Sequence, residues 1–352
     1  MKKSHGKATL KNNLVLPERL VEIDLLKGMA IIAVILIHTW SAAVLLSIGA
    51  PFHIYHAVPF LLLIAGFTGT YSYMRHNATS LRECYDTVLL RRRFKRLFKP
   101  YILMFIIQII ILFGLFRYPF DLGSVLMEFI TGGYGLGAYF VPVIIQSVII
   151  VPILYLLAMR NPNAMLITAF IFNIITEILS ISSVIPPGVY SILYVRFLFA
   201  GALGIWLALS PRHMTLWTGV LGMLSAIYIG IMFYTQEFSR FFVTNIGVGI
   251  NQTPAFFWTY ILALLGFLYL PKKSGSSIYR GLENAGKASW HIFLIQMTFF
   301  SLWQPLNSGV LTPVYYLFPP VFSFIGLIII ASVTIAICTG TGYLWYTYES
   351  AG

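Results

Sequence analysis

The feature that most constrains this chain is a series of apolar runs, each long enough to cross the hydrocarbon core of a bilayer, which takes about 20 residues in a helix. A segment inside lipid has to satisfy its own backbone hydrogen bonds, so each run is expected to be a helix. The alternating ten-residue segments of a membrane barrel are absent. We predict an all-α, polytopic membrane protein with a ten-helix transmembrane bundle, its spans at residues 25–47, 56–74, 98–116, 138–159, 164–183, 189–209, 214–234, 254–271, 287–305 and 319–345.

The composition of the chain excludes a water-soluble domain. Only 10% of its 352 residues are charged, whereas a soluble domain carries roughly a quarter. The net charge of +12 comes from basic residues in short loops, which is a topology signal and not a nucleic-acid footprint. The two cysteines, Cys84 and Cys338, imply no disulfide framework.

The basic residues also predict the orientation. All but four of the 23 Lys and Arg fall in the termini and in alternate loops, the exceptions being Lys27, Arg117, Arg196 and Arg240. By the positive-inside rule, both termini are cytoplasmic in a multi-pass protein of the cell membrane. We predict a cytoplasmic N-terminal segment at 1–22, the membrane domain at 23–346 and a short tail at 347–352. The basic start is not followed by a cleavage pattern, so no removable signal peptide is expected.

The first span carries three polar residues on one face. Asp24 lies one turn before Lys27, and His38 follows Lys27 by three whole turns, roughly 16 Å along the axis. One interpretation is a snorkelling lysine and a structural histidine. The other is a site in which His38 acts as a general base, because a neutral imidazole accepts a hydroxyl proton near pH 7.

A second polar pair lies in the fifth and sixth spans. Glu177 and Arg196 are at matching depths, which predicts an ion pair between the two helices, and Asn173 shares the face of Glu177. The pair is either structural or a site in which Arg196 orients a substrate.

Six positive charges lie within nine residues, at Arg91, Arg92, Arg93, Lys95, Arg96 and Lys99. One interpretation is that these charges set the membrane topology and bind anionic lipid headgroups. The other is that they bind the phosphates of a nucleotide-bearing donor such as coenzyme A. Arginine favours the second interpretation, because its planar fork grips phosphate with two hydrogen bonds.

Other polar residues carry weaker signals. His53 and His56 could share a helix face, but no carboxylate is near them in sequence, so metal binding is only a weak alternative. His56 is also a candidate for contact with the substrate or the oxyanion. Gln146, Gln252 and Gln296 are expected to be interior hydrogen-bonding residues.

Six segments in order resemble membrane acyltransferase family three, the multi-helix enzymes that acylate cell-surface glycans. They are Ile23–Gly28 followed by His38, Val58–Phe67, Arg93–Tyr101, Tyr139–Pro142, Arg196–Gly201 and Ala288–Gln296. The resemblance implies that Lys27 and His38 are essential and that Arg93 and Arg96 belong to a donor-associated motif. Three positions depart from the family pattern: Lys27 replaces arginine, Ala65 replaces serine and Gln296 replaces a second histidine.

The residues and the resemblance together predict an O-acyltransferase. An acyl group, expected to be acetyl from cytoplasmic acetyl-CoA, moves to a hydroxyl of an extracytoplasmic or lipid-linked glycan, with His38 as the base. Tyr139 or Gln296 is the expected oxyanion donor. Alternatives are a transporter or flippase of a lipid-linked glycan, disfavoured because no discontinuous helix pair is visible, and an N-acyltransferase of an amino sugar. No oligomeric state is predicted.

Overall fold

The computed structural model describes residues 19–210, 214–235, 252–273, 275–306 and 320–351. All regular structure in these ranges is helical, as predicted. The longer helices are α1 (Val21–Thr39), α3 (Ala57–Arg75), α5 (Thr87–Ile109), α6 (Leu122–Thr131), α7 (Phe140–Arg160), α8 (Pro162–Ile181), α10 (Leu198–Leu209), α11 (Leu216–Thr235), α12 (Phe256–Tyr269), α13 (Ser277–Lys287), α14 (Ser289–Leu306) and α16 (Pro320–Ala351). The short elements are α2 (Ala42–Ser47), η1 (Ala50–Phe52), η2 (Ile54–His56), α4 (Leu81–Cys84), η3 (Ile110–Leu115), α9 (Pro187–Ile192), η4 (Tyr194–Phe197) and η6 (Thr253–Ala255).

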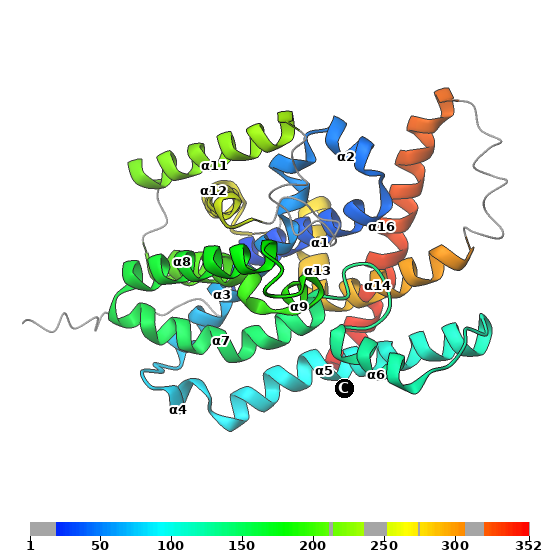
Figure 1. Cartoon of the computed structure of the whole chain (residues 1–352), viewed down its shortest axis with the longest axis horizontal. Coiled ribbons are helices and arrows are strands. Elements are labelled where there is room, and N and C mark those ends of the chain that lie inside the picture. The colour runs from blue at the N-terminus through cyan, green and yellow to red at the C-terminus, as the bar shows by residue number, and fades with distance from the viewer. Residues whose placement is uncertain (1–18, 211–213, 236–251, 274, 307–319, 352) are drawn as a thin grey trace, which may run out of the picture.

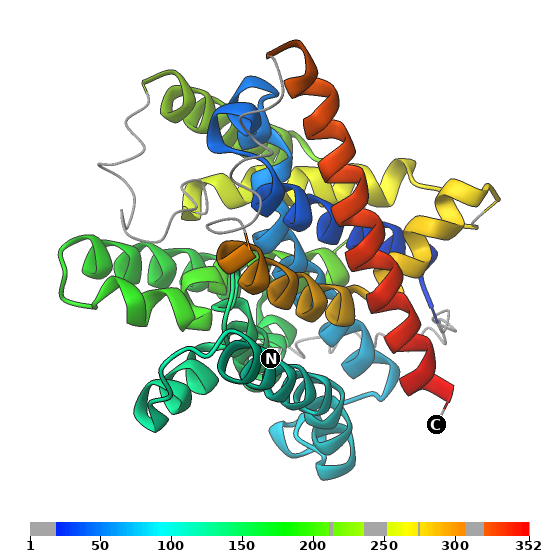
Figure 2. The same ribbon diagram turned by 90° about the vertical axis from the view of Figure 1, so that its right-hand side faces the viewer.

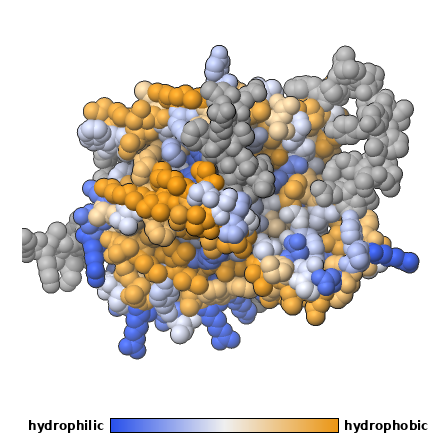
Figure 3. All heavy atoms as spheres, in the orientation of Figure 1, coloured by the Kyte–Doolittle hydropathy of each residue, from blue (hydrophilic) through white to orange (hydrophobic). Residues whose placement is uncertain are grey.

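The helices make a multi-pass membrane bundle. In the described part of the chain, six helices are long and apolar enough to cross a membrane: Ala50–Arg75, Leu81–Leu115, Phe140–Arg160, Pro162–Ile181, Leu216–Tyr234 and Ile325–Ala351. Shorter apolar helices occupy the predicted sixth, eighth and ninth spans, and the charged helix α1 occupies the first. The count of ten therefore stays a prediction. Apolar side chains cover most of the face in Figure 3, with hydrophilic ones concentrated at its margins.

The arrangement places the two ends of the described chain close to one site. In Figure 1, α5, α7, α8 and α11 run in roughly the same direction, whereas the long helix α16 crosses them obliquely. Figure 2 shows α16 lying across α14 and α1, both of which it contacts. The end of α16 thereby comes near the start of α1.

Two of the predicted spans are interrupted. The first stops being helical at Trp40, and α2 begins after the N-cap Ser41. The sixth is divided into α9, the 3₁₀ turn η4 and α10, with extended backbone at Leu193. Gln146 of α7 bridges this break: its Nε2 donates to Ile192 O (2.7 Å), and its Oε1 accepts from Tyr194 N (2.9 Å). Backbone N–H and C=O groups cannot hydrogen-bond to water inside lipid, so the Gln146 side chain replaces the helical hydrogen bonds that are missing at the break.

Two helices extend beyond the predicted spans. Asp86 caps α5 by accepting from the N–H groups of Val88 and Leu89, so the helix begins at Thr87 and the basic run is helical. At the other end of the chain, α16 continues to Ala351, so that most of the residues predicted as a tail are also helical.

The central contact of the bundle is between α3 and α10, and it depends on small residues. A Cβ on Gly66 would meet the backbone oxygen of Gly201, and one on Gly204 would meet that of Leu63. Close approach of this kind is how membrane helices gain packing energy without a hydrophobic driving force.

We therefore expect Gly66→Ala to destabilise the protein by about 1–3 kcal/mol, as overpacking of a tight core does. The measurement is unfolding of the detergent-solubilised protein by heat or denaturant. Gly340→Ala on α16 is the matched control, because a Cβ there meets nothing within 4 Å. Equal stability of the two variants would contradict the proposed contact.

Candidate functional site

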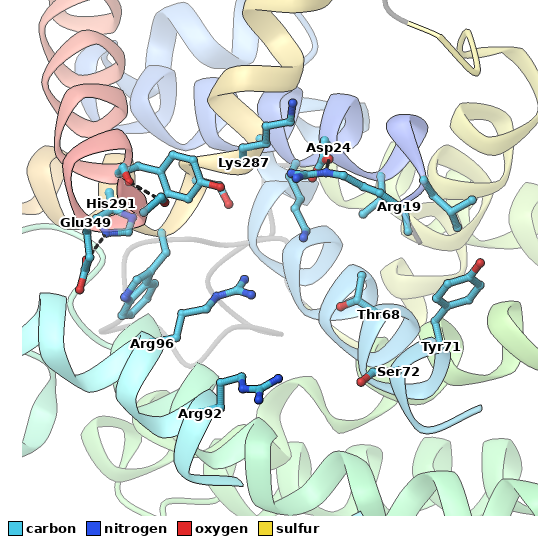
Figure 4. Close-up of a pocket in the computed structure, with 18 of the residues that line it drawn as sticks. Arg19, Asp24, Thr68, Tyr71, Ser72, Arg92, Arg96, Lys287, His291 and Glu349 are labelled. Carbon is cyan, nitrogen blue, oxygen red and sulfur yellow. Dashed lines mark hydrogen bonds and ion pairs between the residues drawn. The ribbon is translucent and has the colours of Figure 1, made fainter. Parts of the chain in front are cut away.

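The largest feature of the site is a basic cavity of about 970 Å³ at one end of the bundle. Its walls come from α1, α3, α5, α13, α14 and α16, and Figure 4 shows Arg92 and Arg96 extending into it from α5. Eight of its lining side chains are cationic: Arg19, Lys27, Arg75, Arg92, Lys95, Arg96, Lys99 and Lys287. Only Asp24 and Glu349 oppose them. This balance suits a ligand with several negative charges.

The two acids of the basic cavity are both engaged. Asp24 is buried and accepts a hydrogen bond from Arg19 Nε at 2.5 Å. This bond raises the pKa of Arg19 above its ordinary value. Glu349 of α16 pairs with Lys99 Nζ (3.1 Å) and with His291 Nε2 (2.8 Å), as Figure 4 shows for the histidine. The acids therefore fix Arg19 and Lys99 in the wall, and Lys287 pairs with Glu283 of its own helix. Within the described residues, the cationic groups without an ion pair are those of Lys27, Arg92, Lys95 and Arg96.

Lys27 lies where the basic cavity adjoins a second one. It lines both this cavity and a groove of about 360 Å³ that leads inward, and within the described residues its ammonium forms no ion pair. Its helix is held by close backbone contact, because a Cβ on Gly28 would meet Leu282 O and one on Gly286 would meet Asp24 O. The sequence prediction that Asp24 and Lys27 share a face is consistent with their shared cavity.

The inward groove has both basic and apolar walls. Besides Lys27, Arg93 and Arg96, its lining includes Ile31 and Ala65. It also includes Phe140, Ile144, Val148 and Val151 of α7 and Phe293 of α14. A groove with both kinds of wall suits a ligand that has a charged part and an apolar part.

The four arginines assigned to donor binding separate into three positions. Arg92 and Arg96 line the basic cavity, and Arg96 also lines the groove. Arg93 lines the groove and is tied to α3, donating to the Tyr73 hydroxyl and to Ser72 Oγ (3.1 Å). Its guanidinium carbon lies 4.4 Å from the Tyr73 ring centroid. Arg91 lines none of the cavities described here.

His38 lies against a glycine-rich turn. An ideal Cβ on Gly137 would be 3.3 Å from His38 Nε2, 3.6 Å from the Phe293 ring and 3.7 Å from Gln296 Nε2. The three side chains thus pack around the glycine, and any side chain at position 137 would press on the imidazole. On its other side, the imidazole meets the ring of Phe300 edge to face at 5.7 Å. No other described residue hydrogen-bonds to either ring nitrogen.

A third cavity, of about 630 Å³, lies next to the ring of Phe300 that His38 meets. Phe300 lines it together with Gly135 and Leu136. Its remaining walls hold three further aromatic rings (Phe113, Tyr118 and Tyr134), Asp121, Ser124 and Ser301. We call it the far cavity. Aromatic faces with a few hydroxyls and a carboxylate are compatible with a sugar.

Amide side chains hold the glycine-rich turn in place. Gln108 donates to Tyr134 O (2.8 Å) and accepts from Tyr134 N (3.2 Å), while Gln296 Nε2 donates to Leu136 O (3.4 Å). Four glycines of the turn, at 132, 133, 135 and 137, have φ between +85° and +115°. Side chains other than glycine rarely adopt this conformation, so the turn is built to approach His38 closely.

The predicted ion pair between Glu177 and Arg196 is wrong. In the described residues, Glu177 Oε2 instead accepts from Thr253 Oγ1 (2.7 Å) and from Thr253 N (3.3 Å). Arg196 is buried in the turn η4, over the rings of Tyr139 (5.4 Å) and Phe197 (5.0 Å), and its Nη1 has no hydrogen-bond partner. The break in the sixth span moved Arg196 off the regular helical position from which the pair was predicted.

His56 does not join the site. Its Nδ1 bonds with Thr259 Oγ1 (2.7 Å) and its Nε2 with Pro51 O (2.9 Å), so both ring nitrogens are occupied by the fold. His53 is exposed and bonds with Ile48 O. In the part of the chain that the structure describes, no cluster of His, Cys, Asp and Glu is suited to a metal ion.

Three features of the site were missed in the sequence. Gln108 and Gly137 are far from His38 in sequence and carry no motif of their own. Glu349 lies in a predicted tail, although it forms a wall of the basic cavity. The run of glycines before Tyr139 was the available signal, because glycine marks close backbone approach.

The family model described as an acyltransferase domain matches residues 20–341. No curated protein and no solved structure gives a significant match. The matched range includes α1, the basic run, the glycine-rich turn and Gln296.

We expect Arg96→Gln to weaken binding of coenzyme A at least about tenfold, because one charge-assisted contact to phosphate contributes roughly 1.5–3 kcal/mol. Arg91→Gln is the matched control, since Arg91 lies on the same helix but lines no described cavity. Equilibrium binding to the purified protein measures both. Equal losses would mean that the basic run acts through overall charge and not through the cavity.

Proposed function

Because the chain belongs to acyltransferase family three, we propose that it is a membrane O-acyltransferase that moves a short acyl group, acetyl first of all, from acyl-CoA to a glycan hydroxyl. The basic cavity faces the cytoplasm and takes the donor, as the positive-inside rule predicts for that end. The acceptor is an extracytoplasmic or lipid-linked glycan in the far cavity.

The observation that carries the proposal is that His38 lies beside one lining residue of each cavity. Phe293 lines the inward groove, and Phe300 lines the far cavity. His38 meets the ring of Phe300, and its Nε2 and the ring of Phe293 both lie beside Gly137. A donor from one side and an acceptor from the other would therefore meet at one imidazole.

Arg92, Arg96, Lys95 and Lys99 would bind the phosphates of the donor, because they line the wide part of the basic cavity. Arg93 would line the inward groove next to the bound donor, and Arg91 would have no direct role. Lys27, oriented with the help of Asp24, would hold the donor where the basic cavity adjoins the inward groove. The uncharged arm of the donor would then lie along the apolar part of the groove.

In the proposed reaction, His38 accepts the proton of the acceptor hydroxyl while the hydroxyl oxygen attacks the thioester carbonyl carbon. The new C–O bond forms a tetrahedral intermediate, whose C–S bond then breaks. The departing thiolate of coenzyme A receives the proton from His38. The products are an ester and free coenzyme A, and the imidazole returns to its neutral form.

Gln296 is the better candidate for the oxyanion donor. Its Nε2 and His38 Nε2 both lie beside Gly137, whereas Tyr139 lies under the guanidinium of Arg196. Preorganised donors at such a position supply a large share of transition-state stabilisation. Arg196, with its unpartnered Nη1, would orient an oxygen of the substrate, and Glu177 would hold the neighbouring turn through Thr253.

The interrupted sixth span favours a second candidate, a transporter or flippase of a lipid-linked glycan, because unwound membrane helices commonly bind transported substrates. The two candidates differ in what His38 does. A transporter needs no proton acceptor at that position, and an N-acyltransferase would leave a base-stable amide.

We expect His38→Ala to lower the transfer of radiolabelled acetyl groups from acetyl-CoA to the glycan fraction of membranes by about 10²–10⁴-fold, the range of a general base. His53→Ala is the matched control, because His53 is exposed and bonds only to backbone.

Retained acetylation by His38→Ala, or loss of glycan export without loss of acetylation, would reject the enzyme mechanism. Lability of the labelled product to mild base separates an ester from an amide.

A further inference from the structure

We propose that the sugar residue that receives the acyl group is uncharged, because the far cavity suits a neutral sugar better than an acidic sugar or an amino sugar with a free ammonium group. This inference rests on the proposed function, since it names the class of acceptor for the same site. It concerns the one residue that occupies the cavity, so a longer glycan that carries charge elsewhere is compatible with it.

The far cavity and the basic cavity differ sharply in charge. Eight cationic side chains line the basic cavity, whereas no described residue that lines the far cavity is cationic. Residues 307–319, which follow α14 in the sequence, include no charged residue. In the predicted topology, the outer loops of the whole chain hold only two basic residues, Arg117 and Arg240. An acidic sugar in the far cavity would therefore lose contact with water and gain no cationic partner from its walls, which costs free energy.

The walls of the far cavity are largely aromatic. Four of its lining residues carry aromatic rings: Phe113, Tyr118, Tyr134 and Phe300. The face of such a ring carries partial negative charge, so it repels a carboxylate or phosphate and attracts the weakly positive C–H groups of a sugar ring. Phe300 is also the ring that His38 meets edge to face at 5.7 Å. A sugar stacked against these rings would lie close to the proposed base.

The polar groups of the far cavity are mostly hydroxyls. Within the described residues, the phenolic hydroxyls of Tyr118 and Tyr134 form no hydrogen bond. Each of these groups can both donate and accept, as the hydroxyls of a neutral sugar do. The Ser124 and Ser301 hydroxyls also line the cavity, and both already donate within the protein. The free hydroxyls of the cavity therefore match a ligand whose own polar groups are hydroxyls.

The one charged side chain in this lining, Asp121, is already used by the fold. Its Oδ2 accepts from Ser124 Oγ (2.7 Å) and from Ser124 N (2.8 Å), and so caps α6. These two bonds hold the pKa of Asp121 below its ordinary value, so the carboxylate is ionised at neutral pH. Its negative charge disfavours an acidic sugar, and an ammonium group would have to share it with the helix cap.

The direct test is to identify the sugar that is acylated. Membranes are incubated with radiolabelled acetyl-CoA, the labelled glycan is cleaved into oligosaccharides, and tandem mass spectrometry locates the acetyl group on one residue. We expect an ester on an uncharged sugar. An acetyl group on a uronic acid, a sialic acid, a sugar phosphate or the nitrogen of an amino sugar would overturn the inference. Absence of label from the glycan would instead reject the proposed function.

Variants of Tyr118 test whether the far cavity binds the acceptor. Tyr118 is 48% exposed, so its replacement is not expected to unfold the protein. We expect Tyr118→Ala to lower acetyl transfer about 2–10-fold, the range of one aromatic contact, with binding of coenzyme A unchanged. Tyr118→Phe keeps the ring and should lose less. Tyr234→Ala is the matched control, because Tyr234 is also exposed, at the predicted outer end of its span, but lines no described cavity. Equal transfer by Tyr118→Ala and the control would overturn the inference.

Arg117 tests the charge of the acceptor. It is exposed and precedes Tyr118 in the sequence, but it does not line the far cavity. For a neutral sugar, Arg117→Gln should leave transfer within about twofold of the wild type. For an acidic sugar, Arg117 would be the nearest cation in sequence, and its loss should lower transfer about tenfold or more. A loss of that size in folded protein that still binds coenzyme A would overturn the inference and leave the proposed function in place.

Discussion

Everything in this structure depends on satisfying backbone polar groups where helices are interrupted inside lipid. An unpaired N–H or C=O there costs several kcal/mol, so an interruption persists only with a substitute partner. Four amide side chains supply it: Gln108 and Gln296 for the glycine-rich turn, and Gln146 and Asn173 for the broken sixth span. Each can both donate and accept, which is what a pair of exposed peptide groups needs.

These amides are also what assembles the site. By holding Tyr134 and Leu136, Gln108 and Gln296 press the glycine-rich turn against His38. By holding the carbonyl of Arg196 and the N–H of Phe199, Asn173 fixes the turn that carries the buried guanidinium. In a bundle of uninterrupted helices, these polar side chains would not come together. The interruptions bring groups from α1, α14 and the segment before α7 together at one imidazole.

The sequence predicted what depends on local pattern. Apolar length gave the helices, the family resemblance was confirmed by the match over residues 20–341, and the spacing of Asp24 and Lys27 placed them on one cavity wall. It did not predict what depends on contacts between distant segments. Arg196 was assigned a partner on the assumption of a regular helix, and the 3₁₀ turn at 194–197 removed that partner. Gln108 acts through Tyr134 and Thr298, and Glu349 acts only because α16 folds back to Lys99 and His291. The periodicity of a sequence does not indicate which distant segments come into contact.

The basic cavity is walled by residues from both ends of the described chain, from Arg19 before α1 to Glu349 and Ser350 in the last turn of α16. During biosynthesis Arg19 and α1 are made long before Glu349 and Ser350 have left the ribosome. A nascent chain that still lacks α16 has an open trough in place of a chamber, and its Lys99 and His291 have no counter-ion. The proposed donor site is therefore complete only after the final helix has been inserted and has closed the wall.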